Sequence, residues 1–212
     1  MNSEKTKITD GTEMKIMSGI VRTYRADKSG GRKMYYSANY SSPVGDIVLA
    51  SDETHIVGLW AKGQKYFGDT VSAEMTENET LPIMLQAKAW LDDYFTGRKP
   101  SIDSLPLAPI GNEFRQCVWQ LLKEISYGET TTYGELAKKA AVRMKKEKMS
   151  ARAVGGAVGR NPISIIIPCH RVVGANGSLT GFSGGIDMKI WLLEHEGTDM
   201  NGFFIPKRGT AI

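Results

Sequence analysis

The sequence has few of the features on which secreted and membrane proteins depend. Only two of its 212 residues are cysteine, Cys117 and Cys169, which is too few for a disulfide scaffold and fits a reducing compartment. No apolar run reaches the roughly 18–20 residues needed to cross a bilayer. The first ten residues contain no apolar stretch of the signal-peptide type. We therefore expect a cytoplasmic protein, associated with the nucleoid if it is bacterial, that makes no contact with a membrane.

The remaining composition is that of a folded protein with an uneven charge. Hydrophobic residues make up 41% and charged residues 24%, and the length allows one large domain or two small ones. The net charge of +4 arises entirely in the second half, where residues 133–160 hold eight basic and two acidic side chains. Such a surplus attracts polyanions, nucleic acid above all, although a solvated face is the simpler alternative.

The distribution of apolar runs and prolines predicts two domains. Two apolar runs at residues 47–50 and 56–60, separated by a polar turn, indicate a β-hairpin. Apolar residues at helical spacing predict a helix over residues 81–95. The expected organisation is a polar N-terminal arm (1–34), an α/β domain (35–99), a proline-rich linker (100–109) and a C-terminal domain (110–212).

The second half contains three short amphipathic patterns. Apolar residues at helical spacing predict a helix over residues 114–125. Thr132 and Glu135 match a capping box, which predicts a helix that runs to about residue 141. A further helix over residues 151–159 consists of small residues. Two short helices in succession suggest a helix-turn-helix, although their connection is longer than usual.

The two cysteines lie in different surroundings. Cys117 is on the apolar stripe of its predicted helix, where a cysteine is usually a buried, inert hydrophobe. Cys169 follows residues 163–167, which are β-branched and apolar and predict a short buried strand. It lies beside His170 and Arg171, and cationic neighbours favour the thiolate that nucleophilic chemistry needs. These residues alone leave open whether Cys169 is reactive.

The run Ile167-Pro168-Cys169-His170-Arg171-Val172-Val173 resembles the active-site signature of the O6-alkylguanine-DNA alkyltransferases, also called methylated-DNA–protein-cysteine methyltransferases. The resemblance covers roughly residues 111–197, whereas the N-terminal half resembles the family only loosely. The further matching positions include Thr132-Tyr133-Gly134, Ala151-Arg152-Ala153-Val154-Gly155, Asn161-Pro162, Gly184-Gly185, Lys189 and Leu192-Leu193-Glu194-His195-Glu196.

This resemblance implies a fold and a reaction. The fold would be an α/β N-terminal domain with a ribonuclease-H-like sheet, followed by a mainly helical C-terminal domain with a helix-turn-helix of winged-helix type. The partner would be double-stranded DNA carrying an alkylated guanine, bound by a monomer through the minor groove. The damaged nucleotide would be flipped out of the stack and its alkyl group transferred irreversibly to a cysteine, once per molecule, without a cofactor.

The resemblance also implies roles for particular residues. Cys169 would accept the alkyl group. His170 and Glu196 would activate the Cys169 thiol through a water, and Asn161 would brace the active-site turn. The residues that would bind the substrate are Tyr133, Val172, Ser183 and Gly184. The residues that would contact DNA are Arg152, Tyr133, Ala151 and Gly155, with Arg152 filling the gap left by the flipped base.

The sequence departs from the family pattern in three places. The basic connection over residues 142–149 is longer than in compact members, and Phe182 stands where many members have tyrosine. The N-terminal half has no cysteine, so the zinc site of some relatives cannot form and we expect no metal. Two other functions stay open, namely a lesion-binding protein that does not accept the group and a DNA-binding thiol redox sensor.

Overall fold

A computed structural model of the chain describes residues 5–7, 12–17, 20–25, 33–71 and 73–207, with side chains from residue 33 onward. The first described strands are β1 (Lys5–Lys7), β2 (Thr12–Met17) and β3 (Ile20–Arg25). They form an antiparallel sheet of their own in the order β1-β2-β3. The sequence analysis predicted only a polar arm here. Charged residues interrupt the pattern in β3, although its Ile, Val, Thr and Tyr residues favour a strand. Residues 1–4, 8–11, 18–19 and 26–32 of that arm lie outside the described residues.

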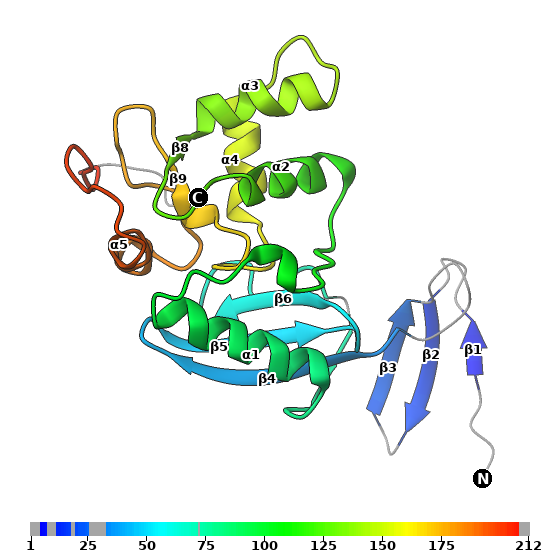
Figure 1. Cartoon of the computed structure of the whole chain (residues 1–212). Helices are drawn as coiled ribbons and strands as arrows, with labels where there is room; N and C mark the ends of the chain where they lie inside the picture. Colours follow the sequence, from blue (N-terminus) through cyan, green and yellow to red (C-terminus); the bar gives the residue numbers. More distant parts are fainter. Residues whose placement is uncertain (1–4, 8–11, 18–19, 26–32, 72, 208–212) are drawn as a thin grey trace.

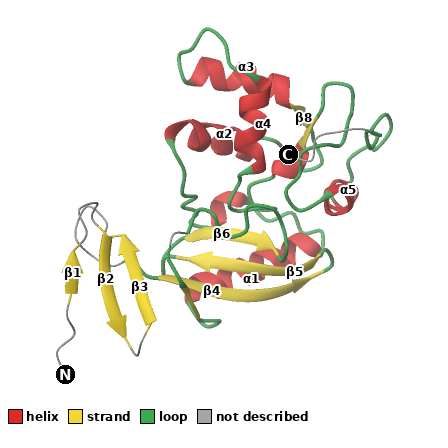
Figure 2. Ribbon diagram, turned by 180° about the vertical axis from the view of Figure 1, so that it is seen from behind, coloured by secondary structure: helices red, strands yellow, loops and turns green. Residues whose placement is uncertain are grey.

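A four-stranded mixed sheet forms the next part of the chain. Its strands are β4 (Tyr35–Ser42), β5 (Gly45–Ser51), β6 (Ile56–Ala61) and β7 (Met75–Glu77), in the order β6-β5-β4-β7. The first three pair antiparallel and β7 runs parallel to β4. The predicted hairpin is therefore confirmed as β5 and β6. Helix α1 (Pro82–Phe95) lies across one face of this sheet, as Figure 1 and Figure 2 both show.

Helices dominate the second part, and their starts follow the sequence signals. The helices α2 (Glu113–Lys123), α3 (Tyr133–Arg143) and α4 (Ala151–Gly159) contact one another. The Thr132 hydroxyl accepts a hydrogen bond from the Glu135 amide at 3.1 Å, which confirms the predicted cap of α3. The Glu135 carboxylate, the other half of the predicted capping box, accepts a hydrogen bond from Lys138 Nζ at 2.8 Å rather than from the Thr132 amide. Ser150 caps α4 in the same way as Thr132 caps α3.

The helical part also contains two 3₁₀ turns, a short two-stranded sheet and a last helix. A 3₁₀ turn, η1 (Ile102–Ser104), precedes α2, and a second one, η2 (Cys169–Arg171), precedes β9 (Val172–Val173). Strand β9 pairs parallel with β8 (Thr131–Thr132), which leads directly into α3. Helix α5 (Ile186–His195) follows a long loop. This pairing brings the start of α3 to the segment that carries Cys169.

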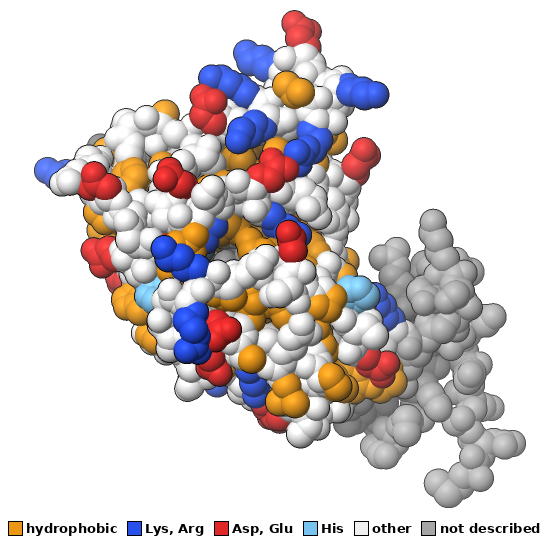
Figure 3. Space-filling model, in the orientation of Figure 1, with side chains coloured by type: hydrophobic (Ala, Val, Ile, Leu, Met, Phe, Trp, Pro, Cys, Tyr) orange, Lys and Arg blue, Asp and Glu red, His pale blue; other side chains and the backbone are white. Residues whose placement is uncertain are grey.

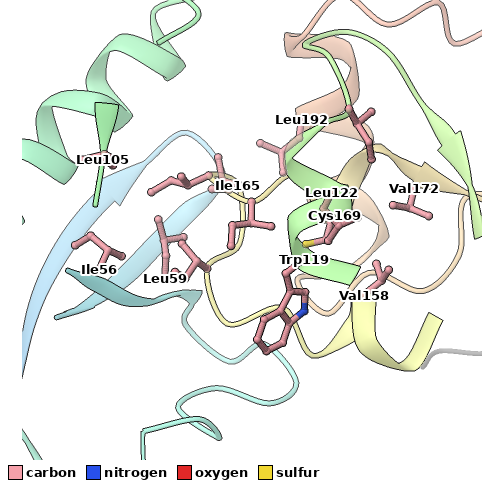
Figure 4. Packing of buried hydrophobic residues seen from close by; sticks show 14 of the residues in the cluster. Ile56, Leu59, Leu105, Trp119, Leu122, Val158, Ile165, Cys169, Val172 and Leu192 are labelled. Atoms are coloured by element: carbon pink, nitrogen blue, oxygen red, sulfur yellow. The ribbon is translucent and has the colours of Figure 1, made fainter. Parts of the chain in front are cut away.

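One hydrophobic core runs through both parts of the molecule. It contains Ile56 and Leu59 from the sheet part, Leu122 and Leu192 from the helical part, and Ile165. Figure 4 shows Ile165 between these two groups, with Cys169 among the helical residues. The two parts are therefore packed against each other through buried apolar side chains rather than joined only by the chain.

The predicted strand over residues 163–167 is wrong. Only Ile163 makes a bridge, to Leu59 of β6, and the next residues form turns. Ile165 has a backbone φ of +69°, in the left-handed region that a β-branched residue rarely adopts and that ends any extended run. The burial of this segment was predicted correctly, since all five residues are buried.

The surface charge gathers where the sequence places it. Figure 3 shows many Lys and Arg side chains over the end of the molecule at which α3 lies, with Asp and Glu side chains among them. Lys138, Lys139 and Arg143 are exposed basic residues of α3, and together they make up the basic face of α3. Within the described residues, no helix is both long and apolar enough to pass through a bilayer.

Candidate active site

The turn over residues 161–168 places Cys169 against the sheet part. The Leu59 amide donates to the Pro162 carbonyl at 2.8 Å, and the Ser164 amide donates to the Leu59 carbonyl at 3.0 Å. Asn161 holds the turn from inside, because its Oδ1 accepts from the Ile163 amide and its Nδ2 donates to the Ile167 carbonyl at 2.7 Å. The strained φ of Ile165 is thus imposed by surrounding hydrogen bonds.

Cys169 begins η2 and is almost completely buried, with 3% of its surface exposed. Its Sγ accepts a hydrogen bond from Asn161 Nδ2 at 3.0 Å. Burial raises the pKa of the Cys169 thiol, whereas the Asn161 hydrogen bond and the positive charge of Lys189 act in the opposite direction. The resting residue is therefore a thiol held beside groups that would stabilise a thiolate.

His170, the residue next to Cys169, makes a buried hydrogen bond to a carboxylate. His170 Nε2 lies 2.7 Å from Glu196 Oε1, and neither side chain is exposed. Burial lowers the pKa of His170, although Glu196 opposes the shift. The neutral imidazole donates from Nε2 to the carboxylate, which leaves the lone pair on Nδ1. Nδ1 is buried and makes no hydrogen bond to any described residue.

Glu196 accepts hydrogen bonds from three residues in addition to His170. Arg171 donates to both carboxylate oxygens, from Nε at 2.7 Å and from Nη2 at 3.0 Å. The Tyr94 hydroxyl donates at 2.7 Å and the Gly128 amide at 3.3 Å. Burial alone would raise the pKa of Glu196, but the His170 hydrogen bond and the Arg171 guanidinium outweigh it, so this pKa falls well below its ordinary value. Glu196 is therefore ionised.

A second, largely buried set of hydrogen bonds joins Tyr133, Thr180, Lys189 and Val172. The Tyr133 hydroxyl donates to the Thr180 carbonyl at 3.0 Å, and Lys189 Nζ donates to that carbonyl at 2.9 Å and to the Val172 carbonyl at 2.6 Å. Lys189 is completely buried, which lowers its pKa to about 8. Burial raises the pKa of Tyr133, and the nearby Cys169 raises it further. Tyr133 is therefore a hydrogen-bond donor.

The loop before α5 carries Ser183 and Gly184. The Ser183 carbonyl accepts from the Lys65 amide of the sheet part at 3.3 Å. A Cβ at Gly184 would lie 2.6 Å from the Met188 sulfur and 2.8 Å from the Phe182 ring, so a larger residue there would force these side chains to shift. The Phe182 ring lies edge-on to His170, with the ring centres 6.4 Å apart.

The α4 residues divide into an exposed and a buried set. Ala151 and Arg152, in the first turn, are exposed, whereas Gly155 is buried. The buried face meets α2, where Trp119 Nε1 donates to the Ala157 carbonyl at 2.9 Å. The first turn of α4 is thus free to approach another molecule, while Gly155 allows close packing inside the protein.

Two family models match the chain. Residues 113–198 match "6-O-methylguanine DNA methyltransferase, DNA binding domain", and residues 34–109 match "6-O-methylguanine DNA methyltransferase, ribonuclease-like domain". Together these matches span most of the sequence. The chain belongs to the 6-O-methylguanine DNA methyltransferase family. Residues 1–33 lie outside both matches.

Individual family members agree with this assignment. The methylated-DNA–protein-cysteine methyltransferase of Methanosarcina acetivorans is 47% identical over 166 residues, which are 78% of this chain and 99% of that protein. The protein of the same name from Haemophilus influenzae is 42% identical over 163 residues, 77% of this chain and 86% of that protein.

Solved structures of the family have the same fold. The O6-methylguanine methyltransferase of Mycobacterium tuberculosis superimposes with a TM-score of 0.66 at 38% identity, over 77% of this chain and 93% of that chain. M. tuberculosis OGT in complex with DNA superimposes with a TM-score of 0.64 at 39% identity, over 77% of this chain and 92% of that chain. The two-part fold, a mixed sheet followed by helices, is thus the fold of this family.

The structure brings most of the predicted site residues together. Hydrogen bonds connect Asn161 with Cys169, and His170 with Glu196, while β8 and β9 place Tyr133 near Val172. Ala151 and Arg152, the exposed α4 residues expected to contact DNA, make no hydrogen bond to these residues. Cys117, which the sequence predicted to be buried, is only partly buried. Among the described residues, no cluster of His, Cys, Asp and Glu could hold a metal ion.

The sequence analysis did not name the contacts that three residues make in the site. Arg171 was considered only as a cationic neighbour of Cys169, and Lys189 was recognised only as part of a matching motif, although both are buried cations in the site. Tyr94 lies in α1, 102 residues before the Glu196 that it contacts, and no local pattern indicates that pairing. Long-range packing of α1 against the helical part creates it.

Proposed function

We propose that this protein repairs DNA by transferring the alkyl group of O6-alkylguanine irreversibly to Cys169. The observation that carries the proposal is that the cysteine of the family signature is followed directly by His170, whose buried imidazole is held through Nε2 by an ionised carboxylate. That arrangement is an oriented base, which is what a thiol of raised pKa requires. Family membership supports the same reaction.

The proposed step starts from a neutral thiol and a neutral imidazole. His170 Nδ1 draws the Cys169 proton through a water, while Glu196 stabilises the imidazolium that forms. The sulfur attacks the alkyl carbon, the bond between that carbon and guanine O6 breaks, and the oxygen keeps the electron pair. A proton returns to the purine, so an ordinary guanine and a thioether are the products. Asn161 holds the sulfur in line throughout.

We propose that the purine occupies the space between Tyr133 and the loop before α5. The Tyr133 hydroxyl would leave the Thr180 carbonyl and donate to the purine. Thr180 would keep Lys189 as its donor, so this exchange leaves no buried carbonyl unpaired. Backbone groups of Val172, Ser183 and Gly184 would bind the guanine edge. One lone pair of the Val172 carbonyl is already used by Lys189.

DNA binding completes the proposal. The helices α3 and α4 would act as a helix-turn-helix of winged-helix type in the minor groove, with Arg152 in the gap left by the flipped nucleotide and Ala151 close to the DNA backbone. Gly155, the other DNA contact expected from the resemblance, is buried and so would contribute only by letting α4 pack closely. The exposure of Arg152 and the basic face of α3 support this placement. The sheet of residues 35–99 would be ribonuclease-H-like, residues 100–109 a linker, and the protein a cytoplasmic monomer.

The test of the proposal is mass spectrometry of the intact protein after incubation with an O6-methylguanine duplex. The wild-type protein gains one methyl group, and digestion places it on the peptide that contains Cys169. Cys169→Ser gains none, because an alcohol is a far weaker nucleophile than a thiol at neutral pH. The matched control is Cys117→Ser, which removes the other free cysteine and gains one methyl group like the wild type.

Three results contradict the proposal. A methyl group on Cys117, or full transfer by Cys169→Ser, moves the reaction away from the site described above. Unchanged mass of the wild-type protein, combined with tight binding to the lesion, favours a lesion-binding protein that accepts no alkyl group.

A further inference from the structure

A hydroxyl group from the sheet part of the molecule contacts Glu196, which together with His170 and Cys169 forms the proposed relay. Tyr94 is in the last turn of α1, and its hydroxyl donates to Glu196 Oε1 at 2.7 Å. The side chain is 1% exposed, so this bond is shielded from water. Glu196 Oε1 is also the atom that His170 contacts at 2.7 Å. One carboxylate oxygen therefore serves the catalytic imidazole and a residue from the other part of the molecule.

The ring of Tyr94 is held on several sides. It stacks on Trp90, with ring centres 5.6 Å apart and an angle of 8° between the planes. It lies edge-on to Tyr127 at 6.1 Å, and its ring centre is 5.3 Å from that of His195 of α5. The His195 Nε2 atom also lies 2.7 Å from the Tyr94 carbonyl oxygen. Because the ring is fixed by packing, removal of the hydroxyl alone would leave it in place.

A hydrogen bond to a carboxylate withdraws negative charge from the oxygen that accepts it. Less charge on Oε1 means weaker attraction for the imidazolium that forms during transfer. We propose that Tyr94 is a positioning residue of the alkyl-transfer reaction, which orients Glu196 and limits how strongly that carboxylate raises the basicity of His170. This inference rests on the proposed function, since it concerns the relay that activates Cys169.

Other ionisable groups face the same relay and are kept unchanged in the test. They are Arg171 of η2, Lys189 of α5, Tyr127 before β8, Tyr133 of α3 and Cys169 itself. Tyr94 stays protonated across the working range, because burial and the Glu196 charge raise its pKa above the ordinary value. Its hydroxyl is thus a constant donor, and only its removal tests the proposal.

The experiment compares Tyr94→Phe with the wild type in single-turnover methyl transfer between pH 5 and 9. Protonated His170 cannot accept the thiol proton, so the rate falls as the pH drops through the pKa of His170. Loss of the Tyr94 bond leaves more charge on Glu196 Oε1 and raises that pKa. The acid limb therefore moves to higher pH, and the rate at pH 6 falls by about tenfold, more than at pH 8.

The matched control is Tyr40→Phe. The Tyr40 hydroxyl donates to Asp92 Oδ1 at 2.8 Å, so this variant also removes a tyrosine–carboxylate bond, but one outside the relay. It leaves the acid limb where it is in the wild type. An unchanged midpoint in Tyr94→Phe overturns the inference, and so does a uniform loss of rate at every pH, which a purely structural role would produce.

A second readout separates this inference from the proposed function. Iodoacetamide alkylates thiolates without DNA, and its reaction with Cys169 is followed over many hours in a Cys117→Ser background, because Cys169 is only 3% exposed. A shift of its pH profile in Tyr94→Phe supports the inference even if the wild type takes no methyl group from DNA, a result that would contradict the proposed function alone. Identical iodoacetamide profiles in the two proteins overturn the inference.

Discussion

At the scale of single residues, Glu196 is the group on which the others depend. Its carboxylate is buried and ionised, and it accepts hydrogen bonds from His170, Arg171, Tyr94 and Gly128. A buried charge is stable only when it is paired and hydrogen-bonded in this way. The same bonds that allow the carboxylate to be buried also fix the tautomer of His170.

Glu196→Gln should destabilise the fold at neutral pH by about 3–5 kcal/mol, because Arg171 then keeps a buried charge without its partner. The lowered pKa of Glu196 means that its contribution is complete above the pKa of an unfolded glutamate, about 4.3, and is lost as the pH falls through the folded value. The difference in unfolding free energy between wild type and variant therefore shrinks below about pH 4.3.

Urea denaturation at a series of pH values measures this difference. Glu194→Gln, on the exposed side of the same turn, is the control and changes stability little. A wild-type advantage over Glu196→Gln that stays constant from pH 7 to pH 3 contradicts the assigned charge state.

At the scale of elements, the first turn of α4 is the part most clearly free to meet DNA. Ser150 caps the helix, and Arg152 is exposed beside the cap. If Arg152 occupies the place of the extruded nucleotide, it offsets an unstacking cost of a few kcal/mol. Its role then concerns duplex DNA and not the chemistry at Cys169.

Arg152→Ala should therefore slow methyl transfer from duplex DNA by about a hundredfold, because the flipped state loses what holds it open. Reaction with a soluble O6-alkylguanine base should change less than threefold. Single-turnover rates with both substrates measure the two effects. Lys139→Ala, which removes another exposed cation from the basic face, weakens binding but affects flipping little. Equal losses on both substrates would remove Arg152 from base extrusion.

The elements also show how far the sequence could lead. Helix starts were predictable, because the hydroxyls of Thr132 and Ser150 satisfy backbone donors within three residues of themselves. The β5–β6 hairpin was predictable for a similar local reason. The strand expected over residues 163–167 was not formed, since hydrogen bonds from Asn161 and Leu59 impose a turn that β-branched residues alone disfavour.

The residues of the candidate site also differ in whether local sequence could identify them. Cys169, His170, Asn161 and Glu196 could be named from motifs, and the structure adds that they form buried hydrogen bonds. Tyr94 could not be named, because its contact joins residues 102 positions apart. The sequence could not show that Lys189 is an important residue of the site, because its complete burial results from the packing of α5 against η2.

At the scale of the whole molecule, the two parts act as one unit around Cys169. They share one hydrophobic core, β6 holds the turn before Cys169, and α1 supplies a donor to Glu196. The product of the proposed reaction is a thioether within that core. A thioether is a poor leaving group, and no described cysteine other than Cys117 is present to accept the alkyl group. Each molecule should therefore act once.

The most direct test of this account titrates a fixed amount of protein with excess O6-methylguanine duplex and measures the guanine that is restored. The account predicts a plateau at one restored guanine per protein molecule, with one methyl group on each Cys169. More than one restored guanine per molecule would contradict it, since the sulfur would then be regenerated, and so would a protein that binds the duplex and restores none.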